Sequence, residues 1–239
     1  MSNLIVGSLV YNEEHKFLKQ YLNGISKIAN KIVIIDDGST DNSVNICEKY
    51  TDIIGITEHV FHKNESQLRQ ALWEACTKQC KENDFILIQD CDELYTDSSL
   101  LHFQQAIQIA DKLQADGIGI NLYDMWNENQ YREEPPYWTA NKHFWVRCVR
   151  YKKNYTYYWN SNKLHCGSLP INAYYCAIPT KLQIKHMAYS TLELRQKKVE
   201  FYNNLDPQAK YGIKAQYDSI LDENPILKDF KDKFEELHE

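Results

Sequence analysis

The chain has 239 residues, of which 43% are hydrophobic and 25% are charged, and its formal net charge at pH 7 is −6. This balance excludes a disordered or fibrous protein and offers no general attraction to nucleic-acid phosphates or to an anionic membrane surface. No apolar run approaches the roughly 20 residues of a membrane span, and the N-terminal residues from Met1 do not resemble an export signal, so we expect a cytoplasmic protein with reduced cysteines.

Apolar strands and amphipathic helices alternate through the first half of the chain. Residues 4–10 and 31–35 are apolar runs typical of strands buried on both faces, and residues 13–28 between them carry apolar side chains at helical spacing. The alternation continues with helices expected at 43–50, 65–81 and 98–113 and strands at 53–57, 84–88 and 117–122. Ser98 or Ser99 is the expected N-cap of the last of these helices. This order predicts an α/β fold with a doubly wound, mostly parallel sheet.

From residue 123 onward the pattern becomes aromatic and is interrupted by prolines, which predicts an antiparallel edge with long loops. Its rings either stack on a sugar or fill a core, and we consider six of them: Trp126, Tyr137, Trp138, Tyr157, Tyr158 and Trp159. Beyond this region we expect a helix over residues 191–203 and a charged helix broken at Pro225.

Acidic side chains directly follow two of the apolar strands. Asp36 and Asp37 end one strand, and Asp90 and Asp92 follow another. Because ligands of open parallel sheets bind at the carboxyl ends of the strands, we expect both groups to face one crevice. A solvated turn is the alternative for either pair alone. Two pairs together favour a bound cation, and hard oxygen ligands select Mn²⁺ or Mg²⁺.

The chain resembles family 2 glycosyltransferases of the GT-A fold. The resemblance is carried by VYNEE at 10–14, IDDGSTD at 35–41, NESQLR at 64–69 and QDCDE at 89–93. It implies an inverting, metal-dependent enzyme that moves a sugar from a nucleotide diphosphate donor, with a UDP-sugar expected first, to an acceptor hydroxyl. The chain would then comprise a nucleotide-sugar-binding half (1–122), an acceptor-side region of the same domain (123–190) and a C-terminal helical appendage (191–239).

The resemblance also implies roles for single residues. Tyr11 would lie against the nucleotide base, and Asp37 would reach the base or the ribose. Asp90 would meet the ribose, the metal or a metal-bound water, and Asp92 would bind the metal that bridges the two phosphates. The remaining residues expected at the nucleotide are Val10, Asn12, Glu13, Asp36, Arg69, Cys91 and Lys198, with a solvated helix face as the alternative for Arg69.

Residues 184–189, followed by Arg195 and Lys198, resemble the closing segment of some family members, in which a histidine supplies a further metal ligand. His186 would take this role, since neutral imidazole is compatible with manganese. A purely structural histidine is the alternative. Arg195 and Lys198 lie three residues apart and would either cover the diphosphate or stay solvated.

The chain departs from its relatives at the catalytic base, because no Glu-Asp pair follows the acceptor-side loop. His165 is the first candidate because of its ordinary pKa, and Asp124 and Glu134 are the others, with a polar loop contact as the alternative for each. A weakly active or inactive nucleotide-sugar-binding module therefore stays open. So does a nucleotidyltransferase, although no glycine-rich loop follows the first strand.

The acceptor is open as well. A glycan, a lipid-linked saccharide or another hydroxyl compound would fit the implied reaction, and the acidic net charge disfavours a nucleic acid without excluding it.

Overall fold

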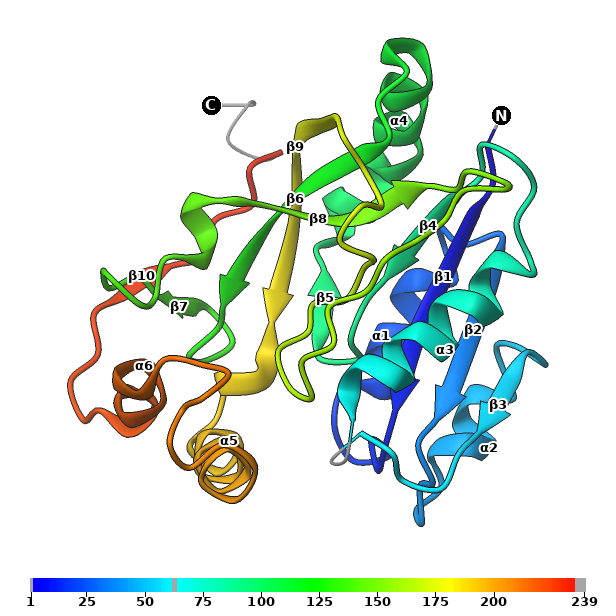
Figure 1. Ribbon diagram of the computed structural model, residues 1–239. Helices are drawn as coiled ribbons and strands as arrows, with labels where there is room; N and C mark the ends of the chain where they lie inside the picture. The colour runs from blue at the N-terminus through cyan, green and yellow to red at the C-terminus, as the bar shows by residue number, and fades with distance from the viewer. Residues whose placement is uncertain (1, 62–63, 235–239) are drawn as a thin grey trace.

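The computed structural model describes residues 2–61 and 64–234 (Figure 1), so Met1 and the end of the predicted C-terminal appendage, 235–239, lie outside the described residues. The elements follow in the order β1 (Leu4–Val10), α1 (Leu18–Ile25), β2 (Lys31–Asp36), α2 (Ser43–Cys47), β3 (Ile54–Ile56), α3 (Glu65–Thr77), β4 (Phe85–Ile88), β5 (Glu93–Tyr95), α4 (Asp97–Leu113), β6 (Gly117–Asp124), β7 (Gln130–Arg132), η1 (Ala140–Lys142), β8 (Phe144–Arg150), β9 (Ala177–His186), η2 (Met187–Tyr189), α5 (Leu192–Leu205), α6 (Lys214–Asp218), η3 (Ser219–Leu221) and β10 (Leu227–Asp229).

Within the described residues, eight strands form one sheet in the order β3-β2-β1-β4-β8-β6-β9-β5, and β7 pairs with β10 in a small second sheet. The strands β1 to β4 are parallel, β8 runs antiparallel to both β4 and β6, and β6 is parallel to β9. Five strands that border the site, β1, β2, β4, β6 and β9, therefore point the same way. The predicted α/β class with a mostly parallel sheet is confirmed.

The position of the antiparallel strand differs from the prediction. We expected it at an edge, yet β8 lies inside the sheet with Cys148 and Val149 fully buried. Arg147 and Arg150 flank these two residues, so the sequence contains no apolar run long enough to predict a buried strand here. At the edge beyond β9 lies β5, which pairs antiparallel with β9 and was not predicted.

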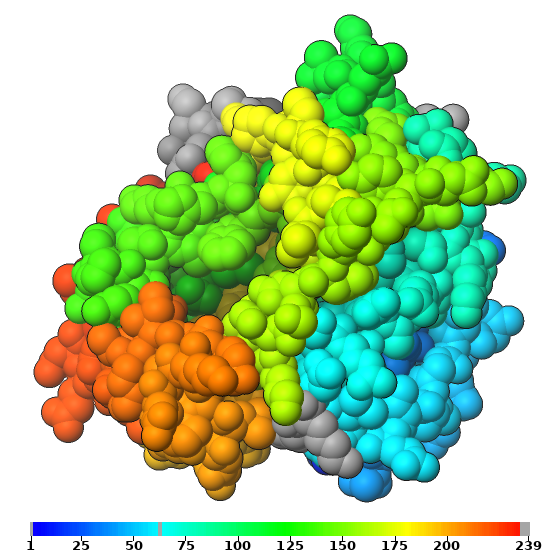
Figure 2. Space-filling model, viewed as in Figure 1, coloured from blue at the N-terminus to red at the C-terminus, as the bar shows by residue number. Residues whose placement is uncertain are grey.

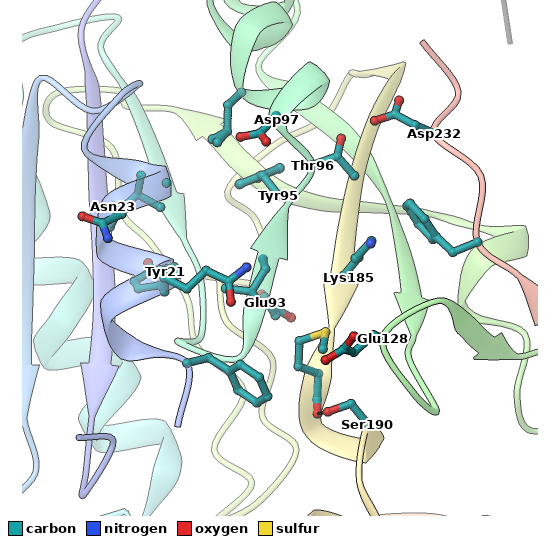
Figure 3. A pocket seen from close by; sticks show the side chains of 18 of the residues that line it. Tyr21, Asn23, Glu93, Tyr95, Thr96, Asp97, Glu128, Lys185, Ser190 and Asp232 are labelled. Carbon is teal, nitrogen blue, oxygen red and sulfur yellow. Dashed lines mark hydrogen bonds between the residues drawn. The ribbon is translucent and has the colours of Figure 1, made fainter. Parts of the chain in front are cut away.

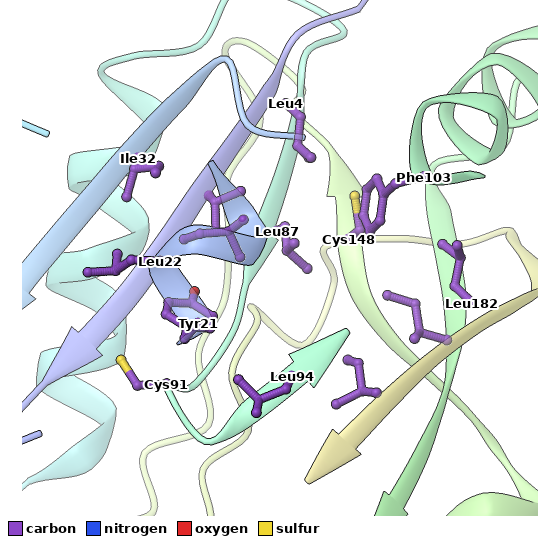
Figure 4. Packing of buried hydrophobic residues seen from close by; sticks show 14 of the residues in the cluster. Leu4, Tyr21, Leu22, Ile32, Leu87, Cys91, Leu94, Phe103, Cys148 and Leu182 are labelled. Carbon is purple, nitrogen blue, oxygen red and sulfur yellow. The ribbon is translucent and has the colours of Figure 1, made fainter. Parts of the chain in front are cut away.

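Helices cover both faces of the sheet, as the apolar strands predicted. Alternate residues of the strands face opposite sides, so Leu4 packs in the cluster with α1 and α4, while Ile5 packs in the cluster with α3. Figure 4 shows part of the first cluster, where Tyr21 of α1 and Phe103 of α4 approach the sheet from the same side. Burial on both faces explains why the strand runs are almost wholly apolar.

Several element boundaries correct the sequence expectations. The Thr96 side chain caps α4 by accepting a hydrogen bond from the Ser99 backbone N–H at 3.2 Å, so neither Ser98 nor Ser99 is the N-cap. Of the charged helix expected near the C-terminus, only the short helix α6 is present among the described residues. The chain after Pro225 forms the strand β10. In the described part of the chain, no helix combines the length and the apolar content needed to cross a membrane.

Two of the six aromatic rings considered are buried, and Tyr157 and Trp159 are partly buried against a core cluster. Trp126 and Trp138 are buried and pack edge to face with ring centroids 5.0 Å apart. Tyr157 and Trp159 pack against Trp73 of α3 in the second cluster. Packing therefore decides the position of these four rings.

Gly7 gives a test of how closely α3 approaches β1. An ideal Cβ at Gly7 would lie 2.5 Å from Cys76 Sγ and 2.9 Å from Ile88 Cδ1, both of which are buried. We expect Gly7→Ala to lower the free energy of unfolding in urea by about 1–3 kcal/mol through overpacking. Gly55→Ala on β3 is the matched control, since its nearest neighbour would lie 3.7 Å away. Equal stability of the two variants would contradict this packing.

Candidate functional site

A cavity of about 990 Å³ opens at the carboxyl ends of β1, β2, β4, β6 and β9. Figure 2 shows the surface hollowed between the segment around η1, the helices α5 and α6, and the loop near residue 165. The cavity is lined by twelve of the predicted site residues: Val10, Tyr11, Glu13, Asp37, Arg69, Asp90, Cys91, Asp92, Asp124, His165, His186 and Lys198. Residues predicted from distant parts of the sequence thus meet in one place.

Asn12, Asp36 and Glu134 are predicted site residues that do not line the cavity. Asp36 Oδ1 accepts hydrogen bonds from the backbone N–H groups of Gly38 and Ser39, and Asn12 Oδ1 accepts one from the Thr40 N–H. These two side chains shape the loops after β2 and β1. Glu134 instead accepts two hydrogen bonds from the guanidinium of Arg132, at 2.9 and 2.6 Å. The structure therefore gives no support to Glu134 as the base.

Arg69 is held inside the protein. Its side chain is 7% exposed, which rules out the alternative of a solvated helix face. It donates to Asp90 through two N–H groups, at 2.6 and 3.1 Å, and to Glu65 at 3.2 Å. Burial alone would raise the pKa of Asp90, but the adjacent guanidinium outweighs it and holds the pKa well below its ordinary value. Asp90 is thus ionised with both oxygens engaged, and its contacts with ribose or metal stay predictions.

Asp92, His186 and Asp124 form the centre of the site. Parallel pairing of β6 with β9 places Asp124 opposite His186. His186 Nδ1 donates a hydrogen bond to Asp124 Oδ1 at 2.7 Å, and His186 Nε2 lies 3.8 Å from Asp92 Oδ2. Burial alone would lower the pKa of His186, but the Asp124 hydrogen bond and the charge of Asp92 raise it to about 9.

A divalent cation fits the Asp92 and His186 pair. The 3.8 Å separation is too long for a hydrogen bond, yet it is shorter than two metal–ligand bonds of about 2.1 Å each, so one ion could touch both atoms. Over the described ranges 2–61 and 64–234, no three His, Cys, Asp or Glu side chains are grouped to hold a metal. The remaining ligands would be water and substrate phosphates, which magnesium commonly retains.

Asp92 also differs from the other acids of the cavity. Each of the others accepts a hydrogen bond: Glu13 from Lys16, Asp37 from Thr57, Glu65 and Asp90 from Arg69, Glu93 from Arg147 and Asp124 from His186. Among the residues the structure describes, Asp92 has no hydrogen-bond donor within reach of its carboxylate. A carboxylate left without a donor beside a fixed imidazole is the arrangement that a cation would complete.

The region predicted for the nucleotide base is occupied by the segment after β3. The ring of Tyr11 stacks on that of His59 with centroids 4.1 Å apart. Asp37 accepts hydrogen bonds from the Thr57 hydroxyl at 2.6 Å and from the Val60 and Phe61 N–H groups at 2.7 and 2.9 Å. The roles of Tyr11 and Asp37 at the base stay predictions, and a nucleotide reaching Asp37 would have to replace some of these contacts.

The opposite wall contains residues that the sequence patterns did not single out. Trp145 of β8 is 43% exposed and donates its indole N–H to the Ala140 carbonyl at 2.9 Å, which fixes the ring. Tyr137 also lines the cavity, whereas Tyr158 does not. Arg147 of β8 joins Glu93 at 2.6 Å. Only a correct assignment of β8 as an interior strand could have pointed to Trp145 and Arg147.

Lys198 and Arg195 have different positions. Lys198 lines the cavity with its ammonium over the rings of Tyr189 and Tyr202, at 6.0 and 5.7 Å from their centroids. Arg195 donates to the Tyr189 and Trp126 carbonyls and does not line the cavity. The prediction that Arg195 covers the diphosphate gains no support, and the one for Lys198 stays open.

A second cavity, of about 950 Å³, lies on the other side of β5 (Figure 3), between α1, β9 and the segment near Asp232. Glu93 lines both cavities. Lys185 lines the second cavity and its neighbour His186 lines the first, because successive side chains of a strand face opposite sides.

The family model described as glycosyl transferase family 2 matches residues 6–172. An uncharacterized glycosyltransferase, MG060, of Mycoplasma genitalium is 24% identical over 118 residues, which cover 47% of this chain and 39% of that relative. The crystal structure of S. aureus TarS 1-349 has a TM-score of 0.49 at 18% identity over 92% of this chain and 69% of that one. Glucosyl-3-phosphoglycerate synthase from Mycobacterium tuberculosis, in complex with Mn²⁺ and UDP-glucose, has a TM-score of 0.37 at 14% identity over 51% and 44%.

Arg69→Met tests whether the buried ion pair supports the site. The change keeps the apolar bulk but leaves Glu65 and Asp90 without their cation, so we expect the free energy of unfolding at pH 7 to fall by about 3–5 kcal/mol. Lys197→Met is the control, because it removes the cation of an i,i+4 pair whose side chains are 62% and 74% exposed, where we expect less than about 1 kcal/mol. Similar losses in urea unfolding would remove the structural role of the buried pair.

The loss of unfolding free energy in Arg69→Met should depend on pH in a definite direction. The folded-state pKa of Asp90 lies below its ordinary value of about 3.9, so the stability it contributes is present above that pH and is lost as the pH falls toward the folded-state pKa. The difference between wild type and Arg69→Met should therefore shrink in acid. A difference that grows below pH 4 would contradict the assignment.

Proposed function

The chain belongs to glycosyltransferase family 2, and we propose that it transfers a sugar, with inversion, from a UDP-sugar to an acceptor hydroxyl with Mn²⁺ or Mg²⁺ bound. The observation that carries this proposal is Asp92, whose carboxylate has no hydrogen-bond donor among the described residues and faces His186 Nε2 at 3.8 Å. The surrounding cavity is also lined by Tyr11 and the Arg69–Asp90 pair, to which the family resemblance assigns contacts with the nucleotide.

Asp92 and His186 would hold the ion. When bound, the ion neutralises the charge that develops on the leaving diphosphate. Asp124 accepts the Nδ1 proton of His186 and so directs Nε2, which has no hydrogen-bond partner among the described residues, toward Asp92. Because the pKa of His186 is raised, a bound ion would displace the proton that Nε2 otherwise carries at pH 7. Lys198 adds a positive charge to the same wall of the cavity.

The wall formed by Tyr137 and Trp145 is proposed to receive the acceptor. The Trp145 ring is fixed and partly exposed at the cavity wall, and an aromatic face of this kind can stack on the apolar face of a sugar ring. A glycan or a lipid-linked saccharide thus fits this wall better than a strongly charged acceptor does. The volume of about 990 Å³ leaves room for a donor and part of an acceptor.

His165 is the favoured base. Direct displacement needs one group that removes the acceptor proton. Asp124 already accepts the hydrogen bond from His186, and Glu134 is paired with Arg132 outside the cavity lining. His165 lies on the cavity wall, and partial burial of its ring lowers its pKa, which keeps the imidazole neutral at pH 7.

The product that the protein releases distinguishes the proposed transferase from the two alternative functions. A transferase should release UDP slowly from its UDP-sugar in the presence of Mn²⁺, with water as the acceptor. A nucleotide-sugar-binding module would bind the donor without releasing UDP, and a nucleotidyltransferase would release pyrophosphate from a nucleoside triphosphate. A panel of UDP-sugars, with release of UDP as the readout, distinguishes the three.

Asp92→Asn tests the proposed metal site. We expect Mn²⁺-dependent binding of UDP, measured by calorimetry, to disappear while the thermal unfolding midpoint changes little, because this carboxylate supports no hydrogen bond in the described structure. Asp97→Asn is the control, since that side chain is 92% exposed and lies outside this cavity. Unchanged Mn²⁺-dependent binding in Asp92→Asn would remove the central claim.

Asp124→Asn tests the proposed role of the carboxylate behind His186. Loss of such an outer partner typically weakens metal affinity about 10–100-fold, and we expect this reduction in the Mn²⁺ affinity of the UDP complex. Asp111→Asn supplies the control, because Asp111 pairs with Arg150 away from the cavity. Equal Mn²⁺ affinities in the two variants would show that Asp124 does not orient a metal ligand.

A further inference from the structure

A chain of hydrogen bonds joins His165 to the C-terminal part of the protein. His165 Nε2 lies 2.7 Å from the Tyr217 hydroxyl oxygen, and that hydroxyl lies 3.2 Å from Asp206 Oδ2. The Asp206 carboxylate also accepts hydrogen bonds from the backbone N–H groups of Lys210 and Tyr211, at 2.7 and 3.0 Å. The loop that carries His165 therefore meets the C-terminal segment 206–217 beside the cavity.

The chemistry of these groups fixes where the protons lie. An ionised aspartate can only accept, so the single proton of the Tyr217 hydroxyl is donated to Asp206. The Tyr217 oxygen must then accept from His165, which places a proton on Nε2. In the neutral ring the lone pair is consequently on Nδ1.

Packing holds the middle of this chain in place. Tyr217 is buried and its ring stacks on Tyr202 with centroids 4.0 Å apart and planes 7° apart. Asp206 is 3% exposed at the end of α5. Gly212 makes room for the Tyr217 hydroxyl, because a Cβ at this position would overlap it. The Tyr217 hydroxyl therefore has little freedom to choose another partner.

His165 is anchored at its backbone as well. Its N–H donates to Glu65 Oε2 at 2.8 Å, while Glu65 Oε1 accepts from Arg69. The residue has a φ of 53°, a left-handed conformation that is uncommon outside glycine and needs support from its surroundings. Glu65 supports the backbone N–H and Tyr217 supports the ring, and Figure 2 shows the loop near residue 165 resting against α5 and α6.

We propose that Tyr217 and Asp206 are positioning residues that hold His165 with Nε2 protonated and Nδ1 as the basic nitrogen. The inference rests on the proposed transferase function. The acceptor O–H gives its proton to Nδ1 while its oxygen bonds to the anomeric carbon. The bond from that carbon to the diphosphate oxygen breaks, and its electron pair leaves with the diphosphate. The resulting imidazolium keeps its Nε2–H bond to Tyr217.

The tautomer of His165 tests this assignment without any donor. Long-range ¹H–¹⁵N correlation spectra of the imidazole, assigned by comparison with His165→Gln, should show the Nε2–H form in the wild type. Tyr217→Phe removes the acceptor of that proton, so the Nδ1–H form should become populated. Asp206→Asn gives a second route to the same result, since it frees the Tyr217 proton to point at His165. An Nδ1–H ring in the wild type, or an unchanged tautomer in both variants, would overturn the proposal.

Turnover supplies the second readout. With a UDP-sugar and Mn²⁺, Tyr217→Phe should lower kcat roughly tenfold, a part of the 10²–10⁴ that general-base catalysis contributes, and leave KM for the donor unchanged. The pH profile of kcat should shift with the His165 pKa, which Glu65, Lys198 and Asp206 also influence.

Tyr211→Phe is the matched control, because its hydroxyl makes no hydrogen bond within the described residues and it lies in the same segment. Equal kcat and pH profiles in Tyr217→Phe and Tyr211→Phe would count against the positioning role. Absence of turnover in the wild type, with the Nε2–H tautomer present, would instead count against the proposed function alone.

Discussion

The antiparallel strand β8 is the constraint on which the site depends. Because it lies between β4 and β6 and opposes both, β6 and β9 return to the direction of β1, β2 and β4. Asp124 and His186 therefore end at the same edge of the sheet as Asp90 and Asp92, although up to 96 residues separate these positions in the chain. A β6 paired directly and antiparallel with β4 would carry Asp124 to the opposite edge.

The carboxylates at this edge of the sheet differ in whether a neighbouring side chain compensates their negative charge. Arg69 and Arg147 neutralise Asp90 and Glu93 at short distance, so these acids are fixed parts of the framework. His186 likewise compensates Asp124, to which it donates a hydrogen bond. A repulsive cluster is thereby reduced to one carboxylate with no donor among the described residues, that of Asp92, and a cation bound there would meet little competition from protein donors.

The sequence is sufficient to predict those parts of the structure that depend on local patterns of apolar and polar residues. Strands buried on both faces, the strand ends that carry Asp37 and Asp92, and the presence of α3 with Arg69 all follow from apolar runs and helical spacing. The interior position of β8 could not be derived, because Arg147 and Arg150 break its apolar run and its neighbours are set by long-range pairing. For the same reason, Asp124 was recognised as a candidate base without its partner His186, a contact that depends on the β6 and β9 register.

The sequence did not reveal that the C-terminal segment contributes to the site. Its helices α5 and α6 have few apolar positions, yet Tyr202 and Tyr217 bury their rings against each other and against the core that contains Trp138. That core supports the wall opposite the nucleotide motifs, and the hydroxyl of Tyr217 emerges from it toward His165. Destabilising this aromatic cluster would therefore disturb the cavity wall near His165, and it would also reach His186, whose ring packs edge to face on Tyr189 of the same cluster.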